Sequence, residues 1–360
     1  MVWVLPAMLL VGNLWRQEGD EGRDRLAVVK VLIAGGAGFI GSTVTSACID
    51  AAIEPVVLDN LVTGRAEFTA GRAFYEGDIA DGALLDRIFA EHPDIDAVVH
   101  AAALIVVPES VAEPLRYYRE NVSKSVEFID HVVRNGCTRY LFSSSASIYR
   151  PGDDFSVDEH SAIEPLSPYA RTKAVMEWVL EDTAAATDLR AISLRYFNPI
   201  GADPKMRTGL QIAKPTHVLG KLITALENDE VFAITGTDWP TRDGSGIRDF
   251  IHVWDLAQAH VRALRHFDEV LPADGERSYD VINLGTGNGT TVRELLDAFQ
   301  AVADKPLRVE ETGPRPGDSV GSYTRSTRAR ELLHWAPEFT TEDGIRHSLE
   351  WSARRPTMLS

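Results

Sequence analysis

From residue 28 onward, the chain alternates between short apolar runs and longer segments in which apolar residues recur at helical spacing. Most of the short runs are rich in valine, isoleucine and leucine, and they lie at 28–34, 55–58, 72–75, 95–100, 138–142 and 189–194. A continuous apolar run of this length is typical of a strand buried on both faces of a parallel sheet. The pattern therefore predicts an α/β fold with a doubly wound parallel sheet whose strands are joined by crossover helices.

This rhythm breaks near residue 198, and the rest of the chain has shorter elements and more loops. We expect a nucleotide-binding domain over 29–198 and a smaller α/β lobe over 199–360 that covers the ligand. Residues 248–283 are candidates for packing back against the first domain. The elements expected in this half are strands at 231–234 and 279–284 and helices at 217–227 and 254–267, the second helix being entered from 248–253.

The N-terminus begins with an apolar segment at 1–15, followed by a charged stretch at 16–25. The segment is too short to span a bilayer, and it lacks the basic start and the cleavage site of a secretory signal. We therefore expect residues 1–28 to be an extension from a mis-assigned start, outside the fold. The mass of the natively expressed protein tests this, since an intact Met1 contradicts it.

Composition narrows the function classes. Of 360 residues, 44% are hydrophobic and 25% are charged, which is ordinary for a soluble globular protein. The net charge of −17 is spread along the chain, which argues against nucleic acid or an anionic membrane surface as the main partner. The two cysteines, Cys48 and Cys137, are too few for a disulfide framework and fit a reducing cytoplasm. No cysteine–histidine cluster has metal-ligand spacing, so the sequence implies no metal.

A glycine-rich turn follows the first predicted strand. Residues 35–41 satisfy Gly-x-Gly-x-x-Gly and lead into a predicted helix at 42–52. Such glycines allow a tight turn and the close approach of a pyrophosphate, which the N–H groups at the helix N-terminus bind. The next strand ends in Asp59, 18 residues after Gly41, where a carboxylate accepts from a ribose 2′-hydroxyl. This context predicts NAD rather than NADP; the alternative is a plain α/β turn with an aspartate at a strand end.

Four further residues are candidate cofactor contacts. Asp78 and Ile79 follow the third strand, where an adjacent pair can grip adenine, although Asp78 suits a turn that caps the next helix nearly as well. Ala101 opens a run of small residues after the fourth strand, where backbone can approach a ligand. Asn121 lies inside a predicted helix at 114–133, and we favour a structural role for it, tying this helix to the next strand.

Residues 167–173 read Ser-Pro-Tyr-Ala-Arg-Thr-Lys, and Pro168 suits the first turn of a helix. Tyr169 and Lys173 then share one helix face. To act as a base near neutral pH, the tyrosine must lose ~3 units from a pKa of about 10, which a neighbouring ammonium and a positively charged nicotinamide can together supply. Ser145 ends a serine run after the fifth strand, where doubly wound sheets bind ligands. The alternative for Tyr169 and Lys173 is an ordinary surface helix, and the alternative for the serine run is a polar strand end without a function.

Together these residues resemble the extended short-chain dehydrogenase/reductases, most closely the UDP-glucose (UDP-galactose) 4-epimerases, over about residues 29–350. The general signature is the glycine-rich turn with Ser145, Tyr169 and Lys173. The narrower motifs lie at 58–61, 109–110, 143–146, 195–202, 239–253 and 283–287. The resemblance implies a Rossmann-type fold with a smaller substrate lobe, a UDP-sugar substrate and a permanently bound NAD.

The resemblance also implies a mechanism and a site. Tyr169 would take the proton of the sugar 4′-hydroxyl while a hydride leaves C4′ for the nicotinamide, and the 4-keto sugar would then turn and take the hydride back on its other face. Lys173 would hold the nicotinamide ribose and lower the Tyr169 pKa, and Ser145 would hydrogen-bond the same hydroxyl. The implied cofactor contacts are Gly35, Gly38, Phe39, Ile40, Gly41, Asp59, Asn60, Asp78, Ile79, Ala101, Asn121, Tyr169, Lys173 and Phe197. The implied substrate contacts are Ser145, Tyr169, Asn198, Thr216, Arg248, Arg315, Asp318 and Ser322.

The sequence departs from the family pattern at several of these places. Ile105 replaces a common lysine, Arg150 a glycine, and Pro215 with Thr216 a pair of asparagines. Ser322 stands where some members have a bulky tyrosine, which predicts that N-acetylated sugars are accepted. For Arg248, an ion pair with its neighbour Asp249 remains the alternative to diphosphate binding. Family members are usually homodimers through helices near 114–133 and 168–184, and the resemblance implies the same here.

The same fold and motifs are compatible with other functions. One is an epimerase of a UDP-N-acetylhexosamine, UDP-pentose or UDP-uronate. A 4,6-dehydratase needs an acid/base pair directly after the active-site serine, where Ala146 and Ser147 stand here. A non-catalytic NAD-binding sensor would be expected to lose Tyr169, and replacing this residue with phenylalanine discriminates between sensor and enzyme.

Overall fold

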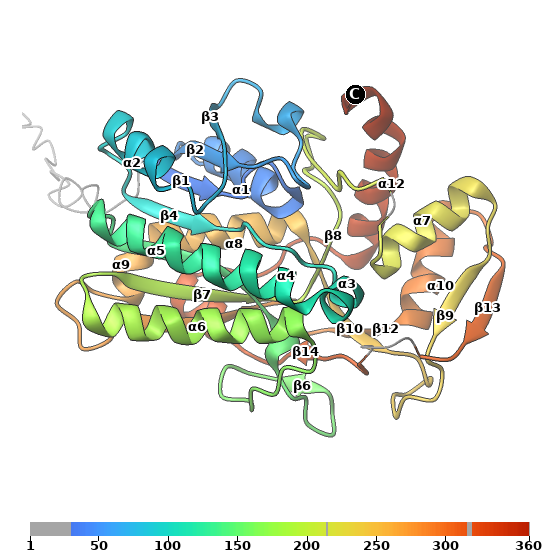
Figure 1. The fold of residues 1–360 in the computed structure, drawn as a ribbon. Coiled ribbons are helices and arrows are strands. Elements are labelled where there is room, and N and C mark those ends of the chain that lie inside the picture. The colour runs from blue at the N-terminus through green and yellow to red at the C-terminus, as the bar shows by residue number, and fades with distance from the viewer. Residues whose placement is uncertain (1–29, 214, 315–318, 360) are drawn as a thin grey trace, which may run out of the picture.

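The computed structural model describes residues 30–213, 215–314 and 319–359 (Figure 1). The predicted extension at 1–28 and the candidate substrate contacts Arg315 and Asp318 lie outside the described residues. Within these ranges, no helix combines the length and the apolar character that crossing a lipid bilayer requires.

The centre of the fold is a seven-stranded sheet with the strand order β11-β7-β5-β4-β1-β2-β3, in which every pairing is parallel. Its strands are β1 (Lys30–Ala34), β2 (Glu54–Asp59), β3 (Ala73–Glu76), β4 (Ala97–His100), β5 (Arg139–Ser145), β7 (Arg190–Tyr196) and β11 (Tyr279–Leu284). The chain runs outward from β1 through β2 and β3, then returns to the other side of β1 to add the remaining four. This reversal is the doubly wound arrangement, so the predicted fold class is confirmed.

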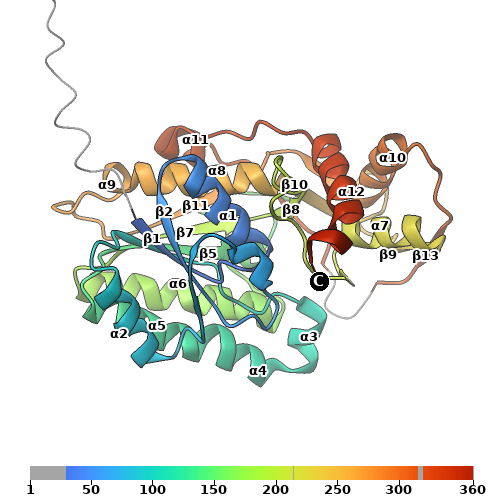
Figure 2. The same cartoon turned by 90° about the horizontal axis from the view of Figure 1, so that it is seen from above.

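Helices cover both faces of the sheet (Figure 2). Val31 and Ile33 of β1 pack into the cluster on one face, whereas Leu32 packs into the cluster on the other, as the alternation of a strand requires. The first cluster is completed by α1 (Phe39–Asp50) and α8 (Val253–Arg265), and the second by α2 (Gly82–Glu91), α5 (Lys124–Arg134) and α6 (Pro168–Ala186). Burial on both faces explains why these strands read as continuous apolar runs.

The predicted helix at 114–133 is present in three parts. They are α4 (Pro114–Tyr118), a π-helical turn η3 (Arg119–Ser123) and α5, and the short α3 (Val107–Ala112) precedes them. A π turn inserts an extra residue into the helical register and often marks a functional site. Here it contains the buried side chain of Asn121.

The remaining strands, most of them in the second half of the chain, build smaller sheets. The three-stranded sheet has the order β12-β10-β8, and two-stranded pairs join β13 to β9 and β14 to β6. Their strands are β6 (Ser156–Val157), β8 (Asn198–Ile200), β9 (Phe232–Thr235), β10 (Ile247–His252), β12 (Gly289–Thr291), β13 (Val309–Thr312) and β14 (Tyr323–Thr324). The further helices are α7 (Val218–Asn228), α9 (Phe267–Val270), α10 (Val292–Ala303), α11 (Arg328–Leu333) and α12 (Thr341–Met358), with 3-10 turns η2 (Ala66–Thr69) and η4 (Ala146–Ile148).

Between these elements the chain returns to the large sheet. After β10, α8 packs against α1, and β11 then pairs with β7 at the sheet edge. Residues 253–284 therefore belong to the layers of the large sheet, although they follow β8, β9 and β10 in the chain (Figure 2).

Candidate active site

Candidate residues from several segments lie along one edge of the large sheet. Asp59 ends β2, Ala101 follows β4, Ser145 ends β5 and Phe197 follows β7. The glycine-rich turn at 35–38 joins the end of β1 to α1 at the same edge. Because all strands are parallel, their carboxyl ends meet there, at the edge where doubly wound sheets bind ligands.

The glycine-rich turn is packed too tightly for any other residue at two positions. Gly35 has a φ of +81°, and a Cβ on it would lie 2.5 Å from the Ala102 nitrogen. A Cβ on Gly41 would lie 2.1 Å from the Gly35 carbonyl oxygen. The helix begins at Phe39, three residues before the predicted start, and no side chain caps its end at Gly38. This leaves the first-turn N–H groups of α1 available for an anion.

Asp59 fastens this turn to the second strand. One carboxylate oxygen accepts from the Ala37 N–H at 2.9 Å, and the other from the Leu61 N–H at 2.8 Å. Burial raises the pKa of Asp59, and these two backbone hydrogen bonds oppose the shift. Each oxygen keeps a lone pair, so the carboxylate can still accept from a hydroxyl group beside it.

Asp78 does not cap the helix that follows it, because Asp81 does so. Instead, Asp78 accepts from Lys124 Nζ at 2.7 Å and from Asn60 Nδ2 at 3.4 Å. Burial alone would raise the pKa of Asp78, but the hydrogen bond from Lys124 and further donors lower it overall. Ile79 is buried in the hydrophobic core, with 8% of its surface exposed.

Asn121 ties its helix to two neighbours, neither of which is the strand that the sequence analysis favoured. Its side-chain oxygen accepts from the Leu104 N–H at 2.8 Å, and Nδ2 donates to the Leu104 carbonyl at 2.9 Å. Nδ2 also lies 3.2 Å from Thr172 Oγ1 on α6. The contacts thus run to the loop after β4 and to the helix of Tyr169, because the π turn directs this side chain inward.

Tyr169 occupies the first turn of α6, as predicted. Pro168 is the first helical residue, and the Ser167 side chain caps the helix by accepting from the Ala170 N–H at 3.2 Å. The tyrosine is half-buried; burial raises its pKa, and a hydrogen bond with Ser145 opposes that shift. The protein's own groups therefore do not produce the lowered pKa that the sequence analysis expected from Lys173 together with a nicotinamide.

Lys173 lies one turn further along the same helix and is 4% exposed. Its Nζ donates to the Ser143 carbonyl at 2.7 Å and lies 4.8 Å from the centre of the Phe142 ring. Burial lowers the pKa of Lys173 to about 7, and the charge of Glu177 acts in the opposite direction. An amine with this pKa gains or loses a proton near neutral pH.

The sequence analysis missed a buried charge network directly behind this pair. Glu177 accepts from Arg195 Nε at 2.9 Å and from the Ser144 hydroxyl, beside the candidate Ser145. Arg195 in turn donates to the Tyr149 hydroxyl at 2.7 Å. The sequence does indicate that Glu177 lies close to Lys173, because it follows Lys173 by four residues and therefore shares its helix face.

The candidate substrate contacts in the described chain come from several elements. Asn198 begins β8 beside Phe250 of β10, Thr216 is exposed just before α7, and Ser322 is half-buried before β14. A small pocket with a cavity volume of about 30 Å³ is lined by residues of α7 and α12 and reaches from Trp351 to Phe39, the first residue of α1. The pocket therefore lies between elements of the second half of the chain and Phe39, one of the candidate cofactor contacts.

Arg248 and Asp249 direct their charges to different groups. Arg248 Nη1 donates to the carbonyl oxygens of Ile247 and Val320, both at 2.7 Å. Asp249 accepts from the Thr286 N–H at 2.8 Å and from further backbone N–H groups of residues 287 and 324. Arg248 thereby contacts the segment that directly follows residues 315–318.

The site fits a dinucleotide in chemical terms. An uncapped N-terminus on the twelve-residue helix α1 suits a pyrophosphate, and the carboxylate of Asp59 suits a ribose hydroxyl. A side chain at Gly38 would meet protein atoms only at 3.4 Å, so glycine keeps the space before the helix open. A parallel α/β sheet with this turn and a Ser–Tyr–Lys group at one edge defines a nucleotide-dependent enzyme of the short-chain dehydrogenase type.

Comparison with known proteins identifies the family within this class of enzymes. Residues 31–285 match the model of the NAD dependent epimerase/dehydratase family, and the chain belongs to this family. It is 40% identical over 328 residues to a UDP-glucose 4-epimerase of Rhizobium leguminosarum bv. trifolii, covering 90% of this chain and 97% of that protein. It is 41% identical over 325 residues to a UDP-glucose 4-epimerase of Azospirillum brasilense, covering 89% of this chain and 91% of that one.

Solved structures give the same result. A UDP-glucose-4-epimerase from Stenotrophomonas maltophila with bound NAD and formylated UDP-arabinopyranose has a TM-score of 0.84 and 34% identity, over 91% of this chain and 99% of that one. The enzyme from Bifidobacterium longum in complex with NAD+ and UDP has a TM-score of 0.84 and 30% identity, over 92% and 100% of the chains. The resemblance stated from the motifs is therefore confirmed.

Proposed function

We propose that the protein is an NAD-dependent 4-epimerase that interconverts UDP-glucose and UDP-galactose. The observation that carries the proposal is that Ser145, Tyr169 and Lys173 lie at the carboxyl edge of the sheet, where the uncapped N-terminus of α1 and Asp59 also lie. Relatives that are 40–41% identical over most of the chain and are named UDP-glucose 4-epimerases support the choice of substrate.

NAD, when bound, supplies an acceptor that takes a hydride from the sugar and returns it. Gly35, Gly38 and Gly41, with Phe39 and Ile40 in the first turn of α1, would hold its pyrophosphate. The remaining contacts proposed are with the riboses, the adenine and the nicotinamide, from Asp59, Asn60, Asp78, Ile79, Ala101, Asn121, Tyr169, Lys173 and Phe197. Asp59 favours NAD, because its negative charge repels a 2′-phosphate.

The chain's own residues manage the proton. Tyr169 takes the proton of the sugar 4′-hydroxyl through its phenolic oxygen, and Ser145 donates to the same oxygen of the sugar. Lys173 holds a ribose and, in its charged form, stabilises the phenolate. Burial raises the Tyr169 pKa and the hydrogen bond with Ser145 acts against this rise, so the positive charge of the oxidised cofactor would provide a further lowering. Proton removal is thereby coupled to the presence of the oxidised cofactor.

The UDP part is assigned to residues of the second half. Asn198, Thr216 and Arg248, with Arg315 and Asp318, would bind uridine and diphosphate, and arginine suits a diphosphate because its planar fork makes paired charged hydrogen bonds. Ser322 would lie beside the hexose, and its small side chain would leave room for an N-acetyl group. The second candidate function is accordingly an epimerase that also accepts UDP-N-acetylhexosamines.

We assign residues 29–198, with 248–283 packed against them, to cofactor binding and the rest of 199–360 to substrate binding. We also propose a homodimer, since apolar side chains are exposed along helices that neighbour one another. Leu115 on α4, Val126 on α5 and Trp178 on α6 are 77%, 41% and 53% exposed. A cytoplasmic location and a place in galactose metabolism follow from the proposed substrate.

Replacing Tyr169 with phenylalanine tests the proposal. Loss of the proton acceptor should lower turnover of UDP-galactose by about 10²–10⁴-fold, while bound nicotinamide, measured after denaturation, stays at the wild-type level. Tyr118→Phe on α4 is the control and should keep wild-type turnover. Turnover of Tyr169→Phe within tenfold of wild type would exclude the proposed chemistry and favour a sensor.

A further inference from the structure

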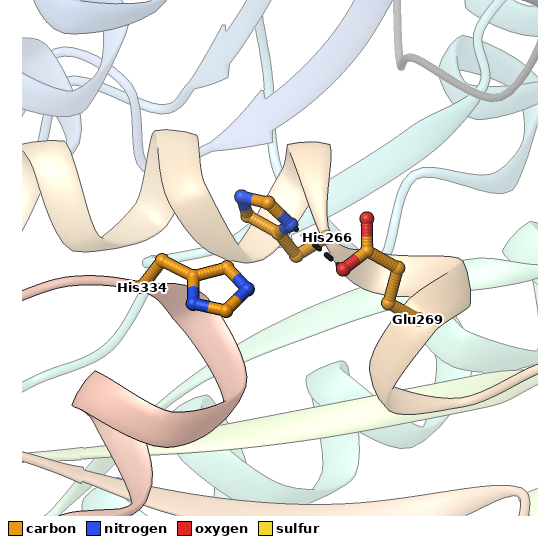
Figure 3. Close-up of side chains that lie close together, drawn as sticks. All are labelled: His266, Glu269 and His334. Atoms are coloured by element: carbon orange, nitrogen blue, oxygen red, sulfur yellow. Dashed lines mark ion pairs between the residues drawn. The ribbon is translucent and has the colours of Figure 1, made fainter. Parts of the chain in front are cut away.

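Three side chains with metal-binding atoms converge where α8 ends (Figure 3). His266 is the C-cap of α8, Glu269 belongs to α9, and His334 is the C-cap of α11. One ligand atom from each lies within 4.8 Å of the other two. The imidazole rings of His266 and His334 meet nearly at right angles, with their centres 5.0 Å apart. Residues 68 positions apart in the sequence thus share one small space.

This cluster lies at the opposite edge of the sheet from the candidate active site. Asp268, between two of its members, pairs with Arg139 and Arg190 at 2.7 Å each. These arginines begin β5 and β7, whereas Ser145 ends β5. A ligand bound by the cluster would therefore sit at the amino edge of the sheet and would not touch Tyr169 or Lys173.

Two features of the histidines define how the cluster is arranged. Nδ1 of His266 is screened from solvent and makes no hydrogen bond to any described residue, although Glu269 Oε2 lies 3.1 Å away. This nitrogen and the Glu269 carboxylate therefore face each other closely without making a well-aligned hydrogen bond. His334 has a φ of +50°, a left-handed conformation that glycine normally supplies at a helix C-terminus. Asp229 and Asp304 end α7 and α10 in the same conformation, so this feature orients the His334 side chain and does not by itself identify a ligand.

The electrostatic setting favours a cation. His266 and His334 both cap the C-terminal ends of helices, which carry partial negative charge. The Glu269 carboxylate adds a full negative charge beside the His266 ring. Two imidazoles and one carboxylate make a ligand set that zinc accepts, whereas calcium and magnesium require mainly oxygen ligands.

We propose that His266, Glu269 and His334 form a binding site for a divalent transition metal of the zinc type, with water as the fourth ligand. Ligand atoms at 2.0–2.1 Å from a tetrahedral metal lie roughly 3.3 Å apart, so the groups that are farthest from each other have to draw together by at most about 1.5 Å. Glu269 and His334 are exposed and can do so by side-chain rotation. The inference does not rest on the proposed epimerase function.

A metal at this position would clamp α11 onto α8 and α9. The clamp would act beside Trp335, which follows His334, packs into the hydrophobic core and donates Nε1 to the Asp255 carbonyl at 3.1 Å. The expected role is therefore structural: bound metal stabilises the folded chain by mass action, since the unfolded chain cannot present the three ligands together.

The test uses the full-length protein after treatment with a chelator. Titration calorimetry with zinc chloride at pH 7.5 should show one site per chain with a dissociation constant below about 50 µM, and the melting temperature should rise by a few degrees at zinc concentrations well above this constant. His334→Ala should weaken binding at least tenfold and remove the melting shift. Glu269→Gln should weaken it less.

His160→Ala is the matched control, because this histidine is exposed and lies outside the cluster. It should bind zinc as the wild type does. Cobalt as a probe should give the visible absorption of a tetrahedral site in the wild type and not in His334→Ala. Absence of saturable zinc binding below about 50 µM, or wild-type zinc affinity in His334→Ala, would overturn the proposal.

Discussion

Lys173 and Glu177 lie one turn apart on α6, and their charges are linked. Burial lowers the pKa of Lys173 to about 7, and the Glu177 carboxylate limits this fall. Glu177 is itself 3% exposed and is held by two nitrogens of the Arg195 guanidinium. The charge state of the candidate catalytic lysine thus depends on an ion pair that lies behind the site.

The first prediction concerns pH. Glu177→Gln removes the charge that opposes burial, so the pKa of Lys173 should fall below about 7. If charged Lys173 supports the phenolate, the alkaline side of the kcat/KM profile should move to lower pH, because the ammonium is then lost earlier. Rates measured from pH 5.5 to 9 test this.

Glu181→Gln supplies the control for this experiment. Glu181 lies on the same helix but is exposed, so its loss should leave the profile unchanged. A Glu177→Gln profile that is lower in rate but unmoved in pH would show that Glu177 acts only on stability.

The second prediction compares a buried ion pair with an exposed one. The Glu177–Arg195 pair is 4% exposed on both sides, whereas Arg150 and Glu164 pair at 3.1 Å with 69% and 53% of their side chains exposed. Arg195→Met should cost about 3–5 kcal/mol in the free energy of unfolding, because it leaves a buried carboxylate uncompensated. Arg150→Met should cost less than about 1 kcal/mol. Equal costs in urea unfolding would contradict this account.

The third prediction is a pH-dependent stability difference. The pKa of Lys173 falls from 10.5 to about 7 on folding, so the unfolded chain binds more protons between these values and wild-type stability rises with pH. The cost of burying the charge is complete below pH 7 and fades toward pH 10.5. Lys173→Met removes this cost at every pH. The unfolding free energy of the wild type minus that of the variant should therefore rise by about 2 kcal/mol from pH 7 to 9; a constant difference would contradict it.

The fourth prediction concerns assembly. Trp178 is half exposed on α6, and Trp178→Glu would place a charge on the apolar face proposed to join two chains. Sedimentation velocity should show a dimer for the wild type and a monomer for Trp178→Glu. Val309→Glu is the control, because this apolar residue is 40% exposed and belongs to β13, in a separate two-stranded sheet. A wild-type monomer would exclude the proposed interface.

The large sheet and the glycine-rich turn could be predicted from local sequence patterns. Five of the six opening strands are apolar runs because both of their faces are buried, whereas β3 at the sheet edge is partly exposed. The turn at 35–41 needs glycine because neighbouring backbone leaves no room for a side chain. Pro168 and the cap at Ser167 fixed the start of α6 in the same local way. Each of these features is decided by residues that are close together in the chain.

Features that depend on distant partners were not predictable in this way. β8 has only three residues and is a strand because it pairs with β10, which in turn pairs with β12, and no local pattern indicates these pairings. Asn121 turns toward Leu104 because a π turn rotates it, and such turns have no sequence signal that we recognised. His334 joins His266 and Glu269 only through the packing of α11 against α8 and α9.

The most direct measurement offers UDP-galactose to the purified protein without added NAD and follows the products by NMR. The account predicts that UDP-glucose forms until both sugars are in equilibrium, with no net oxidation and no free 4-keto sugar, and that Tyr169→Phe forms almost none. Absence of C4′ inversion in a protein that has kept its nicotinamide would contradict the central claim.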